Sequence, residues 1–232
     1  MANGDFIVAE ECVRLGLRAG AILFRHVQVG PARSALRAEI AAEVRRIREE
    51  VVDVEAVRSD PAVMAFRAIL KKVGIHPRKE QPSVERLLNF ALKRGDLPAV
   101  NNLVDAYNLV SVRSLCSLGA HDFDTVAAPV ALRFLTGRES FTPLGRATQI
   151  AVAAGEYGYV DAQDRVLCRL DVLQADFSKV TANTTNAFLI IEGTTAHTPE
   201  LLRQTFADAI EVVTRWCGGE AEVICDPLDL SP

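Results

Sequence analysis

The spacing of hydrophobic and polar residues divides the chain into a β-rich start, a helical middle and a second β-rich part. Near the N-terminus, short alternating segments at residues 6–8, 13–17 and 21–29 predict two or three antiparallel strands. Helical periodicity begins at Ser34 and continues to about Val52, with oppositely charged residues at i,i+3 and i,i+4 spacing on its exposed face. The sequence therefore predicts strands followed by a long amphipathic helix.

Two shorter helices are marked by residues that favour helix ends. The first has a capping residue just before Pro61 and ends at Gly74. The second starts at Ser83 and ends at Gly95, and residues 75–82 form the loop between the two helices. An asparagine-rich segment with helical spacing follows directly, so the middle of the chain is predicted to be almost entirely helical.

After Ser114 the pattern returns to short β segments and turns. Residues 130–135, 140–142, 157–160, 166–170 and 186–191 have the composition of strands. Thr198 opens a last amphipathic helix that Gly218 and Gly219 stop, and residues 221–225 form a final predicted strand. The order of strands, then helices, then strands predicts an α+β fold with a largely antiparallel sheet packed against helices.

The segment 97–110 carries an unusual polar stripe on its predicted helix. At about 100° per residue, Asn101, Asp105 and Asn108 share one narrow face, and apolar residues lie opposite. Asparagine and aspartate are poor helix formers because their side chains compete for backbone hydrogen bonds. A mostly uncharged stripe suits a pocket wall that binds a polar ligand, or else a buried polar helix whose groups are satisfied by neighbouring loops.

Composition narrows the possible functions. The 232 residues include 49% hydrophobic and 24% charged residues, and the formal net charge of −4 argues against a generic polyanion binder. No apolar run approaches the roughly 20 residues that a membrane span needs, and the first residues lack the basic start of a signal peptide. The five cysteines contain no C-x-x-C pair, and the four histidines lack metal-ligand spacing. We therefore expect reduced thiols, no metal and a cytoplasmic protein.

Positive charge is nevertheless concentrated between Arg67 and Arg94. This stretch contains eight lysines and arginines but only two acidic residues, Glu80 and Glu85. Such a local excess can contact phosphates even on an acidic protein. Solvated helix faces are the simpler explanation when charge is considered alone.

Two places combine residues that can carry chemistry. His121 stands beside acidic residues in the run HDFD, which suits a general base or a turn capped by Asp122. Glu192 ends the apolar run 187–191, where a buried carboxylate is costly unless it is paired or used. Glu192 can hold a substrate ammonium, help to place a water, or form an ion pair with Arg113 or Arg133.

Four segments of the chain, taken in order, resemble a known family. They are Gln81-Pro-Ser-Val-Glu-Arg-Leu-Leu88, Leu97-Pro-Ala-Val-Asn-Asn-Leu-Val-Asp-Ala-Tyr-Asn108, Leu118-Gly-Ala-His-Asp-Phe-Asp124, and the stretch from Val180-Thr through Thr185 to Ile191-Glu-Gly193. Together they resemble the editing module of the phenylalanyl-tRNA synthetase beta subunit, called the B-three/B-four domain. The resemblance covers about residues 61–217. Because 232 residues cannot also hold an aminoacylation core, we expect a freestanding member of the family.

The resemblance implies the fold and the activity of that module, which in synthetases hydrolyses tyrosine wrongly attached to the phenylalanine tRNA. It therefore implies deacylation of mischarged aminoacyl-tRNA in trans. Asn108 matches the family's pocket asparagine, and Glu192 matches its strand-end glutamate, which helps to recognise the aminoacyl group. Two positions depart from the family. A histidine of the family falls on Gly119, with His121 two residues further on, and Tyr107 stands where bacterial synthetases often have threonine.

An aminoacyl ester is already activated, so a positioned water and a stabilised oxyanion would suffice for its hydrolysis. We expect Asn108 and the Thr184-Thr185 turn to hold the terminal adenosine or the ester. Glu192 is expected to bind the α-ammonium or to orient the water, and His121 is a second candidate for proton transfer. The residues expected to contact the acceptor-stem phosphates are Lys71, Lys72, Arg78, Lys79 and Arg86.

The sequence thus predicts one domain over residues 1–232. It consists of an N-terminal β segment at 1–30, a connecting helix at 31–60, an editing-module-like core at 61–217, and a C-terminal strand and tail at 218–232. The expected partner is the aminoacylated end of tRNA, with no cofactor, metal or membrane. Two other functions stay open. The departures at Gly119 and His121 favour a non-catalytic tRNA-binding module, and the acidic net charge favours a binder or hydrolase of free amino-acid derivatives.

Overall fold

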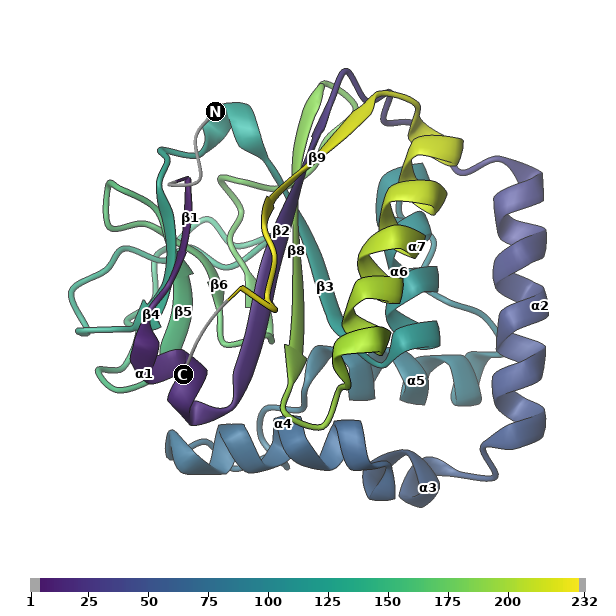
Figure 1. Cartoon of the computed structure of the whole chain (residues 1–232), viewed down its shortest axis with the longest axis horizontal. Coiled ribbons are helices and arrows are strands. Elements are labelled where there is room, and N and C mark those ends of the chain that lie inside the picture. The colour runs from purple at the N-terminus through teal and green to yellow at the C-terminus, as the bar shows by residue number, and fades with distance from the viewer. Residues whose placement is uncertain (1–4, 230–232) are drawn as a thin grey trace.

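Two β-sheets pack against each other in the computed structural model, which describes residues 5–229 (Figure 1). One sheet has the strand order β1-β4-β5-β6-β7, and the other has the order β3-β8-β2-β9. Neighbouring strands are antiparallel except for β1 and β4. The predicted α+β fold with largely antiparallel sheets is confirmed. The strands are β1 (Phe6–Val8), β2 (Leu17–Arg25), β3 (Ser117–Asp122), β4 (Val130–Phe134), β5 (Tyr157–Val160), β6 (Val166–Arg169), β7 (Leu173–Gln174), β8 (Asn186–Thr194) and β9 (Glu220–Cys225).

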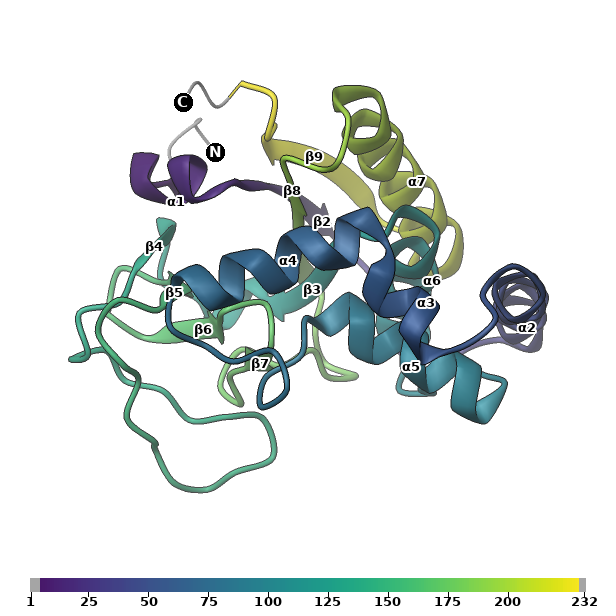
Figure 2. The ribbon, with the colours of Figure 1, turned by 90° about the horizontal axis from the view of Figure 1, so that it is seen from below.

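The helices gather around the four-stranded sheet. α6 and α7 cover its face away from the five-stranded sheet, and α2 lies outside them, where it packs on α5 and α6 (Figure 1). α4 and α5 cross the end of the molecule that faces the viewer in Figure 2. No helix within residues 5–229 combines the length and the apolar character that a membrane crossing requires. The helices are α1 (Glu10–Leu15), α2 (Ser34–Glu50), α3 (Val54–Ser59), α4 (Pro61–Lys72), α5 (Ser83–Arg94), α6 (Asn102–Ser114) and α7 (Pro199–Cys217).

Strand β8 separates two hydrophobic layers. Successive side chains of a strand point to opposite faces of its sheet. Leu189 and Ile191 accordingly join the core under the helices, while Phe188 and Ile190 join the core between the two sheets. Burial on both faces explains why this strand is a continuous apolar run rather than an alternating one. By the same alternation, Glu192 falls on the side of the layer between the sheets.

The prediction of a strand at residues 13–17 is wrong, because residues Glu10–Leu15 form helix α1. Gly16 ends this helix with a φ of 113°, a left-handed conformation that glycine adopts without a steric cost. A single helical turn buries Cys12 and Val13 and exposes Arg14, and so short a pattern resembles strand alternation. Strand β1 then pairs in parallel with β4, and β2 lies between β8 and β9.

Candidate functional site

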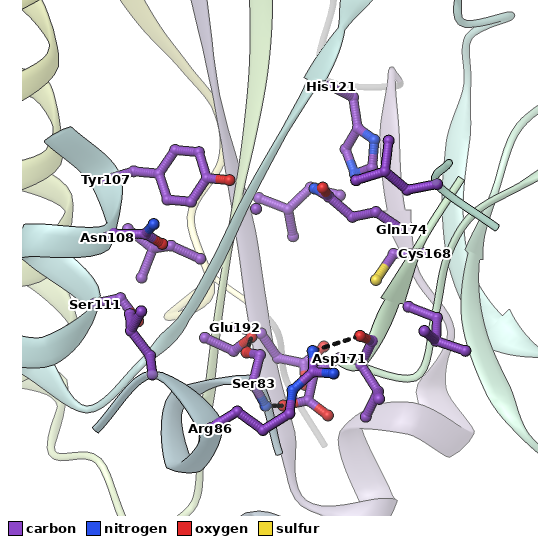
Figure 3. Close-up of a pocket in the computed structure, with 18 of the residues that line it drawn as sticks. Ser83, Arg86, Tyr107, Asn108, Ser111, His121, Cys168, Asp171, Gln174 and Glu192 are labelled. Carbon is purple, nitrogen blue, oxygen red and sulfur yellow. Dashed lines mark hydrogen bonds between the residues drawn. The ribbon is translucent and has the colours of Figure 1, made fainter. Parts of the chain in front are cut away.

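A cavity of about 600 Å³ opens between helices α5 and α6 on one side and strands β6 and β7 on the other (Figure 3). Strand β3 and the end of β8 form its back wall. Its volume lies within the range of small-molecule sites, roughly 300–1,000 Å³. Its polar and titratable lining residues are Ser83, Arg86, Tyr107, Asn108, Ser111, Ser117, His121, Tyr159, Cys168, Asp171, Gln174 and Glu192.

The alternation of strand β3 places residues in this wall. Ser117, Gly119 and His121 occupy every second position, and all three line the cavity. Ser117 pairs directly with Glu192 across the antiparallel ladder, so the two side chains share one face of the sheet. The sequence did not predict β3, because a glycine and a histidine interrupt its apolar pattern.

Glu192 is a buried carboxyl that has no cationic partner among residues 5–229. Only 2% of its surface is exposed, and it accepts hydrogen bonds from the hydroxyls of Tyr157, at 3.4 Å, and Tyr159. Burial and the nearby charge of Asp171 raise the pKa of Glu192 above its ordinary value, and the two tyrosine hydrogen bonds oppose this shift. The ion pair considered from the sequence does not form, since Arg113 binds Glu43 and Arg133 binds Glu139.

Asp171 is a second buried carboxyl in the cavity wall, and sequence reasoning missed it. One of its oxygens accepts a hydrogen bond from the backbone N–H of Ser83 at 3.0 Å, while Oδ1 has no partner in the part of the chain that the structure describes. Burial raises the pKa of Asp171 above its ordinary range, partly offset by the Ser83 bond and the charge of Arg86. Figure 3 shows Ser83, Arg86, Asp171 and Glu192 together at one end of the cavity, which we call the acidic end.

The opposite end, which we call the neutral end, holds Tyr107, His121 and Gln174 (Figure 3). His121 is 1% exposed, and its Nδ1 lies 2.9 Å from the hydroxyl oxygen of Ser178. Burial lowers the pKa of His121 to about 4, so the imidazole is neutral at pH 7. His121, a candidate from the sequence, does line the cavity. The neighbouring carboxylates of Asp122 and Asp124 bind Thr184 and Asn186 and do not reach the imidazole ring.

Gln174 reaches across Gly119 into the neutral end. Its Nε2 donates a hydrogen bond to the carbonyl oxygen of Ala120 at 3.2 Å. A Cβ atom added at Gly119 would lie 3.1 Å from that nitrogen, so the glycine leaves room for the amide. A lone glutamine in a two-residue strand carries no sequence signal, and this residue was also missed.

The polar stripe of helix α6 divides between the cavity and the surrounding loops. Asn108 is half-buried and lines the cavity, as expected. Asn101 caps the helix by accepting from the N–H of Val104, and Asp105 accepts from the N–H of Val100 at 2.9 Å. Asp105 is fully buried and also pairs with Arg37, at 3.0 Å. Asn101 and Asp105 therefore brace loops, as the sequence suggested, while Asn108 and Tyr107 face the cavity.

The turn with Thr184 and Thr185 lies outside the residues that line the cavity. The hydroxyl of Thr184 donates to the carboxylate of Asp122 at 2.6 Å and accepts from the N–H of Thr181. Thr185 is exposed, and its carbonyl oxygen accepts from the N–H of Val27. The polar groups of this turn bind neighbouring segments of the chain, and its role in holding the ligand stays a prediction.

The basic residues of the stretch 67–94 occupy different surroundings. Arg86 is exposed at the cavity, where its guanidinium donates to the carbonyl oxygen of Val172 at 2.7 Å. Arg67 is held by buried Glu85. The remaining candidates for phosphate contacts are exposed and lie at the end of α4 and in the loop that follows it: Lys71, Lys72, Arg78 and Lys79.

Burial disfavours thiolate chemistry in the cavity. Cys168 lines it, but burial raises the pKa of this thiol far above neutral pH. Burial also raises the pKa of Cys116, to about 11. A thiolate is the reactive form of cysteine, so neither is activated as a nucleophile. Within residues 5–229, no group of three or more histidine, cysteine, aspartate or glutamate side chains is arranged to hold a metal ion.

Comparison with known proteins places this arrangement in a family. The family described as the B3/4 domain matches residues 65–217, which is more than half of the chain. The chain therefore belongs to the B3/4 domain family, and the resemblance predicted from its motifs is confirmed. Its fold is similar to that of an N-terminal fragment of the phenylalanyl-tRNA synthetase beta-subunit from Pyrococcus horikoshii, with a TM-score of 0.52 and 12% identity.

That similarity covers 95% of this chain and 51% of the solved fragment, so the chain spans about half of the fragment's length. At this identity the similarity shows the fold alone. A search of curated proteins gave no match. The comparisons therefore show the B3/4 domain family and a fold similar to part of that fragment. Any more specific statement about function has to rest on the residues of the cavity.

Proposed function

We propose that this protein hydrolyses the ester bond of mischarged aminoacyl-tRNA in trans, in the cytoplasm. The observation that carries the proposal is the cavity in which Glu192 and Asn108, the two positions that match the editing module, line the same space. These residues are 84 positions apart in the chain, and the fold brings them to one site.

The cavity suits the aminoacyl end of such a substrate. It has room for an amino-acid side chain and an ester, and it combines an apolar lining with a few convergent polar groups. Arg86 is exposed at the cavity, and Arg78 and Lys79 are exposed on the loop before α5. We propose that these cations, together with Lys71 and Lys72, contact the phosphates of the acceptor end.

In the proposed reaction, Glu192 acts as the general base. Its carboxylate takes a proton from a water molecule, and the oxygen of that water bonds to the ester carbonyl carbon. The bond between this carbon and the ribose oxygen then breaks, and the proton passes from Glu192 to the ribose oxygen. The products are a free amino acid and an uncharged tRNA, so no cofactor is required. We propose that Asn108, which lines the cavity, donates its amide N–H to the developing oxyanion.

The environment of Glu192 fits this role. General-base catalysis works best when the pKa of the base approaches the working pH. Burial and the charge of Asp171 shift the pKa of Glu192 upward in that direction. The hydroxyls of Tyr157 and Tyr159 keep the carboxyl in one orientation. His121 stays a second candidate, with a lower pKa that makes it the weaker proton acceptor at neutral pH.

The test is hydrolysis of a panel of correctly and incorrectly charged tRNAs, compared with spontaneous deacylation in the same buffer. We expect at least one mischarged tRNA to be deacylated much faster than its correctly charged counterpart. Binding of the same tRNAs should weaken steeply with salt, because phosphate contacts release counterions.

One observation favours a second candidate, a non-catalytic tRNA-binding module. The family's histidine is replaced by Gly119, and His121 has a pKa too low for efficient proton transfer at neutral pH. Salt-sensitive tRNA binding with no deacylation across the panel would support that module and exclude the hydrolase. An absence of tRNA binding at low salt would point instead to free amino-acid derivatives as ligands.

A further inference from the structure

We propose that Gln174 is a specificity-determining residue of the cavity, whose side-chain carbonyl oxygen accepts a hydrogen bond from an N–H or O–H group of the aminoacyl-adenosine end. This inference rests on the proposed function, because it names the feature of the substrate that the cavity selects. It is carried by three observations on Gln174, which concern its orientation, its fixed backbone and the space that Gly119 leaves for it.

The orientation of the amide follows from its partner. The carbonyl oxygen of Ala120 can only accept a hydrogen bond, so the group 3.2 Å away must be the NH2 of Gln174. The Oε1 atom is therefore the free end of the amide, and it accepts no hydrogen bond from residues 5–229. In Figure 3 the ends of Gln174 and Tyr107 point toward the middle of the cavity from opposite sides.

The backbone of Gln174 is held on both sides. It pairs with Cys168 in the β6–β7 ladder, and its carbonyl oxygen accepts from the N–H of Leu144 at 2.8 Å. A hydrogen-bonding group on a fixed strand discriminates better than one on a mobile loop, since its geometry is set before the ligand arrives. The acceptor is thus preorganised in the cavity.

Gly119 completes the arrangement. A Cβ atom at this position would lie 3.1 Å from Nε2 of Gln174, closer than most such contacts, so a larger side chain must displace the amide. The backbone of Gly119 does not adopt a positive φ, so its conformation does not demand glycine. The glycine is explained by the glutamine that lies over it.

The ligand group that meets this oxygen must be a donor. Nearby, His121 is neutral and lies within hydrogen-bond distance of Ser178, and no cation among the described residues lines the neutral end. The donor can belong to the amino-acid side chain, to the α-amino group or to the ribose. A site built to hydrogen-bond a substrate group rejects an analogue without it by large factors, because the buried acceptor is then left unpaired.

The experiment compares substrates that differ by one donor. Side-chain donors are tested with tyrosyl against phenylalanyl, seryl against alanyl and threonyl against valyl esters of the same tRNA. The α-amino group is tested by N-acetylation and the ribose hydroxyl by a 2′-deoxy terminal adenosine. The variant is Gln174→Met, which keeps the size of the side chain and removes the acceptor, and Gln163→Met, at an exposed turn outside the cavity, is the control.

We expect wild type to prefer the donor-bearing member in one of these arms, and Gln174→Met to reduce that preference by about tenfold or more. Gln163→Met should leave it unchanged. Gly119→Val should reduce the preference for the donor-bearing substrate in the same way. Adding Gly119→Val to Gln174→Met should reduce this preference no further, since both substitutions act on the same amide. Preferences unchanged by Gln174→Met in every arm would overturn the inference.

A binding measurement separates this inference from the proposed function. Amide-linked analogues, made with 3′-amino-3′-deoxyadenosine, resist hydrolysis and report recognition alone. Binding that depends on Gln174 without any ester hydrolysis would uphold the inference and overturn the hydrolase. Hydrolysis whose substrate preferences are unaffected by Gln174→Met would uphold the hydrolase and overturn the inference. An absence of both binding and hydrolysis would overturn the two together.

Discussion

The acidic and neutral ends of the cavity respond to burial in opposite ways. Glu192 and Asp171 at the acidic end have pKa values raised by burial, whereas His121 at the neutral end has its pKa lowered to about 4. Burial favours the uncharged form in both cases. For a carboxyl this shift leads toward physiological pH, and for an imidazole it leads away from it. Burial therefore moves the pKa of Glu192 in the direction that the proposed general base requires, and it makes His121 a weaker base.

This contrast assigns different tasks to the two ends. The acidic end holds the proton acceptor of the proposed reaction and the charge that adjusts it. The neutral end offers fixed hydrogen-bonding groups. Among them we propose that Gln174 selects the substrate by accepting a hydrogen bond from it. If the division holds, substitutions at the two ends should differ in kind as well as in size.

The largest expected effect is on the rate of deacylation. We expect Glu192→Gln to lower this rate by roughly 10²- to 10⁴-fold, the usual contribution of a general base. His121→Gln should lower it by less than about tenfold. Glu49→Gln, on an exposed face of α2, is the control for charge removal and should have no effect. Equal losses at Glu192 and His121 would contradict the division of tasks.

The stability of the protein should depend on pH with opposite signs at the two ends. The raised pKa of Glu192 means that stability present at low pH is lost as the pH rises above 4.5, its ordinary pKa. The lowered pKa of His121 means that stability present above 6.5 is lost as the pH falls toward about 4.

In wild type, Glu192 should make the free energy of unfolding fall as the pH rises above 4.5, and Glu192→Gln should remove this fall. His121 should make the free energy of unfolding rise between about pH 4 and pH 6.5, and His121→Gln should remove this rise. Each is expected to amount to a few kcal/mol, because one pKa unit corresponds to about 1.36 kcal/mol. Urea unfolding of wild type and both variants at several pH values measures these slopes. Slopes of the same sign in the two comparisons would refute the electrostatic contrast.

A smaller effect is expected from the tyrosine that binds Glu192. The hydrogen bond from Tyr159 lowers the pKa of Glu192, so Tyr159→Phe should raise it. The midpoint of the pH–rate profile should then shift to higher pH by about one unit. At a pH below the midpoint, this shift lowers the rate by roughly tenfold. Tyr107→Phe, at the neutral end, should leave the midpoint where it is. The pH profile of single-turnover hydrolysis shows either result.

The smallest expected effect concerns tRNA binding. Arg86→Ala should weaken binding by a few-fold at moderate salt and reduce the slope of log affinity against log salt by about 1. Arg203→Ala, on α7, removes an exposed charge outside the cavity and serves as the control. An unchanged slope in Arg86→Ala would remove this residue from the phosphate contacts.

Local patterns were enough to predict much of the fold. The apolar run before Glu192 and the periodicity of α2, α5 and α7 identified these elements, because burial imposes a fixed spacing on them. The class of fold followed from the order of the elements. Strand β3 was missed because Gly119 and His121 serve the cavity rather than the core. Helix α1 was mistaken for a strand because one turn is too short to distinguish the two periods.

The candidate site could be predicted only where motifs marked it. Asn108 and Glu192 were found through the resemblance and do line the cavity. Asp171 and Gln174 were missed, since their importance arises from long-range contacts of the β6–β7 hairpin with Ser83 and Ala120, which no local pattern encodes. Thr184 was expected to hold the ligand, but it does not line the cavity, and its hydroxyl donates to the carboxylate of Asp122.

The most direct test of the central claim, that Glu192 at the acidic end is the base of an aminoacyl ester hydrolase, is a pH–rate profile. It would record kcat/KM for the best mischarged tRNA, corrected for spontaneous hydrolysis, with wild type and Asp171→Asn from about pH 5 to about pH 8. We expect the wild-type rate to rise with pH through a midpoint above 4.5, and Asp171→Asn to move this midpoint to lower pH, because it removes a neighbouring negative charge. A midpoint that Asp171→Asn leaves unmoved, or no hydrolysis above the spontaneous rate, would contradict the claim.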